Sequence, residues 1–146
     1  MNFEFSFLGA VLLIMLFIPN IIWNSNRPVG YSSEGENKIL TILEKIGQVL
    51  TSIFSLFCGN GFSWVVLISV ILMILYEIYW IRYFKSNMAL KDMYGNLGII
   101  LVPGAVLPVL AFLFLGIASE NIFLIVSSII LGIGHIGIHY NHRKEL

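Results

Sequence analysis

The sequence predicts an all-α integral membrane protein, a single domain over residues 1–146 that forms a compact bundle of five transmembrane helices. Three observations lead to this prediction: the composition, the spacing of the apolar stretches, and the distribution of Lys and Arg. Hydrophobic residues make up 58% of the chain and charged residues only 11%. A soluble core of this size could not bury so much apolar surface, whereas a lipid bilayer can accommodate it.

The five helices are expected at about residues 5–23, 37–58, 63–83, 97–117 and 121–140. Each is close to the length of about 20 apolar residues that crosses the hydrocarbon layer. Only Glu4 is charged ahead of the first stretch, and no small-residue cleavage site follows it, so we expect a retained membrane helix rather than a signal peptide.

The second stretch is less apolar, because it contains Glu44, Lys45 and Gln48. It could cross the bilayer or lie along its surface as an amphipathic helix. If it crosses, all eight Lys and Arg residues fall on one side of the membrane, and if it does not, they divide five to three. Because Lys and Arg gather on the cytoplasmic side, the first arrangement is favoured. We therefore expect a multi-pass protein of the cell membrane with its N-terminus outside and its C-terminus in the cytoplasm.

Composition also restricts the partners and the chemistry. The net charge is zero and there is no basic tail, so nothing indicates binding to nucleic acid, and the lipid bilayer is the expected surrounding. Cys58 is the only cysteine, which excludes an internal disulfide and a multi-cysteine metal site. An aromatic cluster is expected to form a belt at the inner membrane interface. It consists of Tyr76, Tyr79, Trp80 and Tyr83.

Polar side chains gather on one face of the helix expected at 37–58. At about 100° per residue they fall within an arc of about 120°. The arc holds Thr41, Glu44, Lys45, Gln48, Thr51, Ser52 and Ser55. Polar groups are costly in lipid, so this face should contact other helices or a water-filled cavity. For the hydroxyl groups we expect simple interhelical hydrogen bonds, and for Glu44 a functional role.

The last helix carries a second stripe, in which Ser128, Gly132, His135, His139 and His142 follow spacings of 4, 3, 4 and 3. We expect His135 inside the membrane, His139 at the interface and His142 in water. Three roles remain open: an interhelical hydrogen bond from His135, a protonation role, and a metal site on His135 and His139. The spacing of those two histidines is that of metal-binding helices, although the internal Glu of the metalloprotease motif is missing.

Depth groups polar residues from different helices. At 1.5 Å per residue, Glu44, Glu77 and His135 each lie roughly 7–9 Å inside the cytoplasmic boundary. Asn20 lies somewhat shallower, and Gln48 belongs to the same polar face as Glu44. We therefore expect one polar layer in which these five residues bind a ligand or exchange protons.

The prolines of the fourth stretch are expected to add backbone groups to this layer. A proline inside a helix lacks the N–H that would bond four residues back. Pro103 should therefore free the carbonyl of Ile99, and Pro108 that of Gly104.

The leading functional hypothesis is a membrane protein with a polar pocket open to the cytoplasm. The pocket would bind or transport a small polar or cationic solute, with proton coupling through the Glu and His residues. Five helices are few for a transporter, so a homodimer is expected. One alternative is a non-enzymatic accessory or protective protein, similar in role to immunity proteins, that acts through another membrane protein. The other is a metal-dependent membrane enzyme, although an enzyme is the less favoured class and no cofactor is specified.

Overall fold

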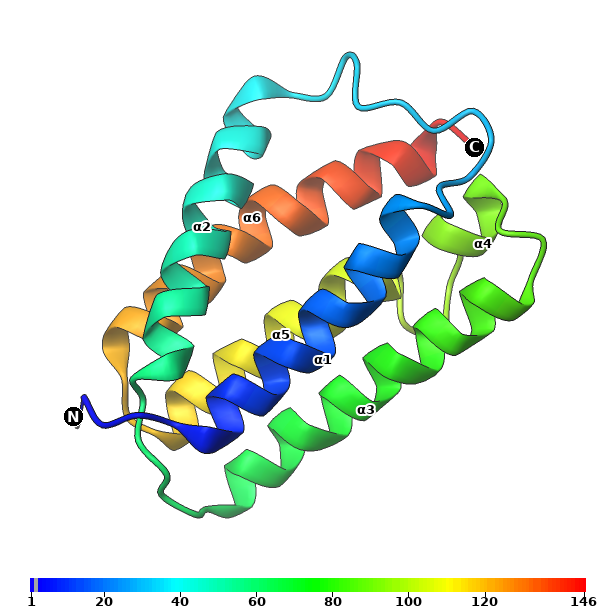
Figure 1. Ribbon diagram of the computed structural model, residues 1–146. Helices are drawn as coiled ribbons and strands as arrows, with labels where there is room; N and C mark the ends of the chain where they lie inside the picture. The colour runs from blue at the N-terminus through cyan, green and yellow to red at the C-terminus, as the bar shows by residue number, and fades with distance from the viewer. Residues whose placement is uncertain (2) are drawn as a thin grey trace.

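Five long helices run alternately between the two ends of the computed structural model, so the N-terminus and the C-terminus lie at opposite ends (Figure 1). The structure describes residue 1 and residues 3–146. The long helices are α1 (Phe7–Asn24), α2 (Lys38–Leu56), α3 (Trp64–Lys85), α5 (Pro103–Ala118) and α6 (Ile122–Lys144). A short helix, α4 (Leu90–Tyr94), lies at the same end as the C-terminus. The all-α prediction is confirmed, since the described residues form no β-strand beyond one isolated bridge between Leu97 and Ile100.

Side-chain caps determine where three of the helices begin. Ser6 accepts a hydrogen bond from Gly9 N at the start of α1, at 3.0 Å. Asn37 accepts from two backbone N–H groups at the start of α2, and Asn121 accepts from one at the start of α6. Each cap satisfies N–H groups that have no partner within the helix.

The helix expected at 97–117 is the one that the sequence places incorrectly. Here α5 begins only at Pro103, which occupies the first helical turn, where its missing N–H costs nothing. Val102, just before it, has a positive φ of 38°. Residues 97–102 are therefore not helical, and Pro103 does not free the carbonyl of Ile99 as predicted. Pro108 does lie inside the helix, as expected.

The shorter α5 is the central helix of the bundle. It packs mainly against α3 and α6, and Ile117 is its only residue in the exposed class. It has 16 residues and is apolar but shorter than the other four long helices. Because irregular backbone is tolerated at membrane depth where protein covers it, a central helix does not need the full length of a lipid-facing one.

Two glycines bring α2 and α6 into backbone contact. A Cβ atom on Gly134 of α6 would lie 2.3 Å from Glu44 N, and one on Gly47 of α2 would lie 2.4 Å from Leu131 Cα. Only glycine fits at such an approach. The contact holds the polar face of α2 directly against the histidine face of α6.

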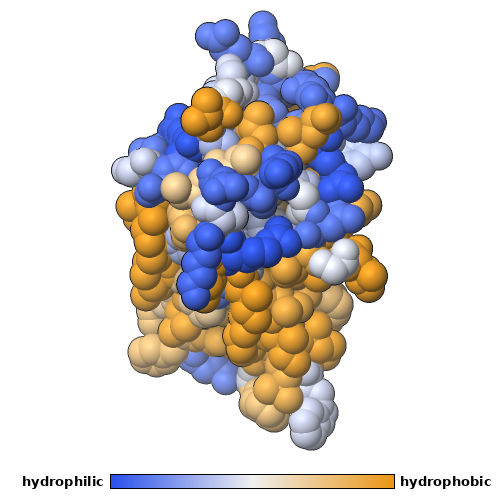
Figure 2. All heavy atoms as spheres, turned by 90° about the vertical axis from the view of Figure 1, so that its right-hand side faces the viewer, coloured by the Kyte–Doolittle hydropathy of each residue, from blue (hydrophilic) through white to orange (hydrophobic). Residues whose placement is uncertain are grey.

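The surface of the bundle is suited to lipid. Four helices, α1, α2, α3 and α6, are long and apolar enough to cross a membrane. Isoleucines dominate their exposed positions, among them Ile21 at 70% and Ile39 at 69% exposed. Apolar atoms cover the lower part of the face in Figure 2, and polar atoms gather at the upper end, which carries the C-terminus.

Candidate functional site

A carboxylate–histidine pair joins α2 to α6. His135 Nδ1 lies 2.5 Å from Glu44 Oε1, and each side chain is 25% exposed. The pair forms because Gly134, next to His135 in sequence, lets the backbone of Glu44 approach α6. Of the roles left open for His135, the interhelical hydrogen bond is thus present.

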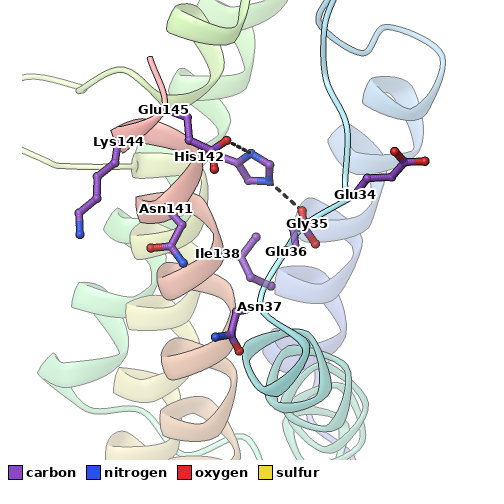
Figure 3. A pocket seen from close by; sticks show the side chains of 9 residues that line it. All are labelled: Glu34, Gly35, Glu36, Asn37, Ile138, Asn141, His142, Lys144 and Glu145. Atoms are coloured by element: carbon purple, nitrogen blue, oxygen red, sulfur yellow. Dashed lines mark hydrogen bonds and ion pairs between the residues drawn. The ribbon is translucent and has the colours of Figure 1, made fainter.

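A second pair lies closer to the C-terminus. His142 Nε2 is 2.7 Å from Glu36 Oε1, and the His142 ring stacks on Tyr94 with ring centroids 5.0 Å apart. His142 lines a pocket of about 370 Å³, and its other nitrogen lies 3.9 Å from Glu145 (Figure 3). The prediction that His142 lies in water is wrong, since its side chain is only 13% exposed. The reason is tertiary: the segment between α1 and α2 brings Glu36 over α6, and α4 supplies Tyr94.

His139 lies between the two pairs along α6. It is 9% exposed, and its Nδ1 is buried without a hydrogen-bond partner among the described residues. Its ring centroid is 4.4 Å from that of His135 and 5.2 Å from that of Tyr94. Its expected depth at the membrane interface stays a prediction, and among the helices it is enclosed because α4 covers this part of α6. The three histidines therefore follow one another along α6, with Tyr94 packed against both His139 and His142 and an acidic partner at each end.

A cavity of about 190 Å³ at the C-terminal end of the bundle is lined by His135 and His139 but not by His142. Two carboxylates, Glu36 and Glu44, face it, and no Lys or Arg is among its lining residues. Four aromatic side chains contribute to the wall. They are Trp23, Tyr31, Trp80 and Tyr94. The cavity is therefore acidic and aromatic.

The four aromatic rings of the cavity wall differ in the cations that they already contact. The guanidinium of Arg27 lies 5.1 Å from the Trp23 ring and 5.8 Å from the Tyr31 ring, so these two rings contact a cation of the chain itself. Burial raises the pKa of Tyr31 and of Tyr94, so both phenols stay neutral at physiological pH. The negative charge available to a ligand is therefore that of the two glutamates.

Four of the five residues predicted to bind a ligand or exchange protons lie at this cavity. They are Asn20, Glu44, Gln48 and His135. Glu77 does not line it. One of the carboxyl oxygens of Glu77 is buried on α3 without a hydrogen-bond partner in the described part of the chain. Glu44, Glu77 and His135 were grouped because they share a depth. Depth gives the position of a side chain along the bundle but not the direction in which it faces, and Glu77 does not face this cavity.

Asn20 has a structural partner of its own. Its Nδ2 donates to Tyr76 OH at 2.8 Å and to Leu16 O at 2.7 Å. The amide is thereby held at the edge of the cavity, between α1 and α3.

Sequence reasoning missed the aromatic wall and Glu36. The cluster at 76–83 was expected as an interfacial belt, yet all four of its rings are at most 4% exposed and pack inside the bundle. Its members recur every three or four residues, which places them on one helix face and indicates burial against other helices. No local pattern marks Glu36, because its role depends on how the connecting segment folds.

The metal hypothesis gains no support from the geometry. Within the described ranges, no three His, Cys, Asp or Glu side chains are placed to share a metal ion. His135 also uses its Nδ1 for Glu44.

No protein-family model, curated protein or solved structure matches this chain.

Proposed function

We propose that the chain crosses the cell membrane five times, with the N-terminus outside and the C-terminus in the cytoplasm. The alternating run of the five long helices supports this topology. So does the charge distribution, because all eight Lys and Arg belong to the end that carries the C-terminus, whereas the opposite end carries Glu4 and Glu120. The cavity at Glu44 then faces the cytoplasm.

Within this topology, the cavity binds a small organic cation. The observation that carries this proposal is the lining itself: two carboxylates, four aromatic rings, and no Lys or Arg. Cations are attracted to carboxylates and to the faces of aromatic rings, most strongly where water is scarce. An anion would meet two carboxylates and no Lys or Arg side chain. The volume of about 190 Å³ equals the space of roughly six water molecules, which suits a small head of the tetramethylammonium type.

Proton coupling follows from competition at the same carboxylates. A protonated His135 donates its proton in a charge-assisted hydrogen bond to Glu44. A cation bound next to Glu44 would compete with a protonated His135 for the same carboxylate, because two positive charges close together repel each other. The cation and the proton would therefore exclude each other at Glu44, and exchange across the membrane requires that the site open to each side in turn. Such a cycle would exchange a cation for a proton, and a homodimer is the assembly that we propose for it.

Proteoliposomes with a trapped pH-sensitive dye test this function. A gradient of tetramethylammonium should drive proton movement in the opposite direction in the wild type. Glu44→Gln should abolish the movement, because it removes the charge that both the cation and His135 use. The matched control is Glu120→Gln, at the other end, which should behave as wild type. Equal proton movement in empty liposomes, or in Glu44→Gln, would refute the proposal.

A further inference from the structure

A second, smaller cavity continues the first one along the bundle. It measures about 50 Å³ and shares four lining residues with the larger cavity, Asn20, Glu44, Gln48 and His135. The rest of its lining is apolar. That part consists of Leu16, Pro108, Val109, Phe112 and Leu131. Polar character thus changes to apolar character from the larger cavity to the smaller one beside it.

The opening of this space lies between α1 and α2. At their outer ends the two helices touch, since Ser6 N donates to Leu56 O at 2.8 Å. Towards the cytoplasmic end they diverge, and the 25–37 segment connects them (Figure 1). Asn20 of α1 and Gln48 of α2 both line the two cavities and are both exposed.

The residues around these two amides face lipid in the proposed topology. On α1, Ile18 is 52% exposed and Ile21 is 70% exposed, and on α2, Ile46 and Val49 are 47% and 58% exposed. Uncompensated polar groups at such a position are costly. Asn20 is satisfied by Tyr76, whereas no hydrogen bond from the side chain of Gln48 is found in the described part of the chain.

We infer that the ligand is an amphiphile, with a cationic head in the larger cavity and an apolar chain that passes the smaller cavity and leaves between α1 and α2 into the bilayer. This inference rests on the proposed function, because it takes the cation as its head. The smaller cavity holds only the first part of the chain, since its volume corresponds to about two water molecules. Lipid-soluble amines and quaternary ammonium compounds have this chemistry.

Three probes separate the head from the chain: tetramethylammonium, hexyltrimethylammonium and 1-hexanol. Protein in phosphatidylglycerol nanodiscs is titrated with each, and the fluorescence of Trp23 and Trp80, which line the cavity, reports binding. Hexyltrimethylammonium should bind at least tenfold more tightly than either of the other two. Empty nanodiscs and Glu44→Gln correct for accumulation of cations at the anionic lipid surface.

Leu16→Phe tests whether the apolar chain of the ligand passes through the smaller cavity, because the larger side chain narrows that cavity. It should remove most of the gain from the hexyl chain and leave tetramethylammonium affinity unchanged. Ile14→Phe is the matched control on the same helix, because Ile14 is 56% exposed and lines neither cavity.

The outcomes distinguish this inference from the proposed function. If tetramethylammonium and hexyltrimethylammonium bind equally well, the cation site stands and the amphiphile is refuted. If 1-hexanol binds as tightly as hexyltrimethylammonium, the charged head is refuted. If no cation binds, the proposed function fails together with the inference.

Discussion

The two ends of the α1–α2 pair differ in the contacts that fix the helices in place. At the end that carries the N-terminus, which is the outer end in the proposed topology, the contacts are neutral and tight. Asn60 bonds the chain on both sides of Ser6, accepting from Phe7 N at 2.8 Å and donating to Phe5 O at 2.7 Å. At the opposite end, which is cytoplasmic in the proposed topology, the helices separate, and α2 and its preceding segment form two carboxylate–histidine pairs with α6.

This difference indicates where the bundle is fixed and where it can respond. Neutral amide and backbone hydrogen bonds keep their strength when the pH or a charged ligand changes. Carboxylate–histidine pairs do not, because their strength depends on the protonation of both partners. We therefore assign the outer end to stability and the cytoplasmic end to binding.

The largest expected effect is an all-or-none difference in labelling between the ends. In a Cys58→Ala background, cysteines at Asn60 and Ser119 should react with an impermeant thiol reagent added outside intact cells. Cysteines at Ser33 and Ser86 should react only after the membrane is opened, because they lie at the basic end of the bundle. Labelling of Ser33→Cys from outside would contradict the five-span topology, and with it the assignment of the cavity to the cytoplasm.

The next effect is a large loss of stability at the closed end. A Cβ atom on Gly9 would lie 1.8 Å from Ser55 O, so Gly9→Ala should force α1 and α2 apart. We expect a decrease of roughly 3 kcal/mol in the free energy of unfolding, which exceeds the gain of about 1 kcal/mol in helix propensity. Unfolding in mixed micelles of dodecyl sulfate and dodecyl maltoside measures it.

Gly61→Ala is the control for this measurement. It lies at the same end, and a Cβ there would meet no atom within 4 Å. Its stability should stay within about 0.5 kcal/mol of wild type, as for an ordinary surface change. Equal stability of Gly9→Ala and Gly61→Ala would show that the outer end is not tightly packed.

A smaller effect is expected at His142. In His142→Phe the ring can still stack on Tyr94, but the bond to Glu36 is lost. The free energy of unfolding should decrease by roughly 1–2 kcal/mol, because a partly buried carboxylate loses a charge-assisted partner. Glu145→Gln is the comparison, since Glu145 is 77% exposed and lies 3.9 Å from His142, and it should change little. A His142→Phe variant as stable as Glu145→Gln would place the Glu36 contact among weak surface interactions.

Sequence periodicity predicts the four lipid-facing helices well. The helix expected at 63–83 is found at Trp64–Lys85, and the one expected at 37–58 at Lys38–Leu56. Periodicity does not predict the start of α5 or the presence of α4. Both helices depend on burial and tertiary contacts rather than on exposure to lipid. The apolar run from residue 97 continues into α5, and the signal for the later start is Pro103, because Pro is favoured in the first helical turn and disfavours helix in the residue before it.

The site was predictable in part for a similar reason. Helix position gave the depth of Glu44 and His135, and glycine spacing brought them together. Depth alone could not give direction, so the sequence grouped Glu77 with residues of a cavity that Glu77 does not line. Glu36 and the burial of His142 depend on the path of the 25–37 segment, for which the sequence offers no periodic signal.

The most direct test of the central claim measures access to the cavity itself. Gln48 lines the cavity and is exposed, so Gln48→Cys in the Cys58→Ala background places a thiol at the site. A trimethylammonium-ethyl thiosulfonate reagent should modify it in inside-out vesicles and not in right-side-out vesicles, and tetramethylammonium should slow the reaction. Modification from the outside, or a rate that tetramethylammonium does not change, would contradict a cation-binding cavity open to the cytoplasm.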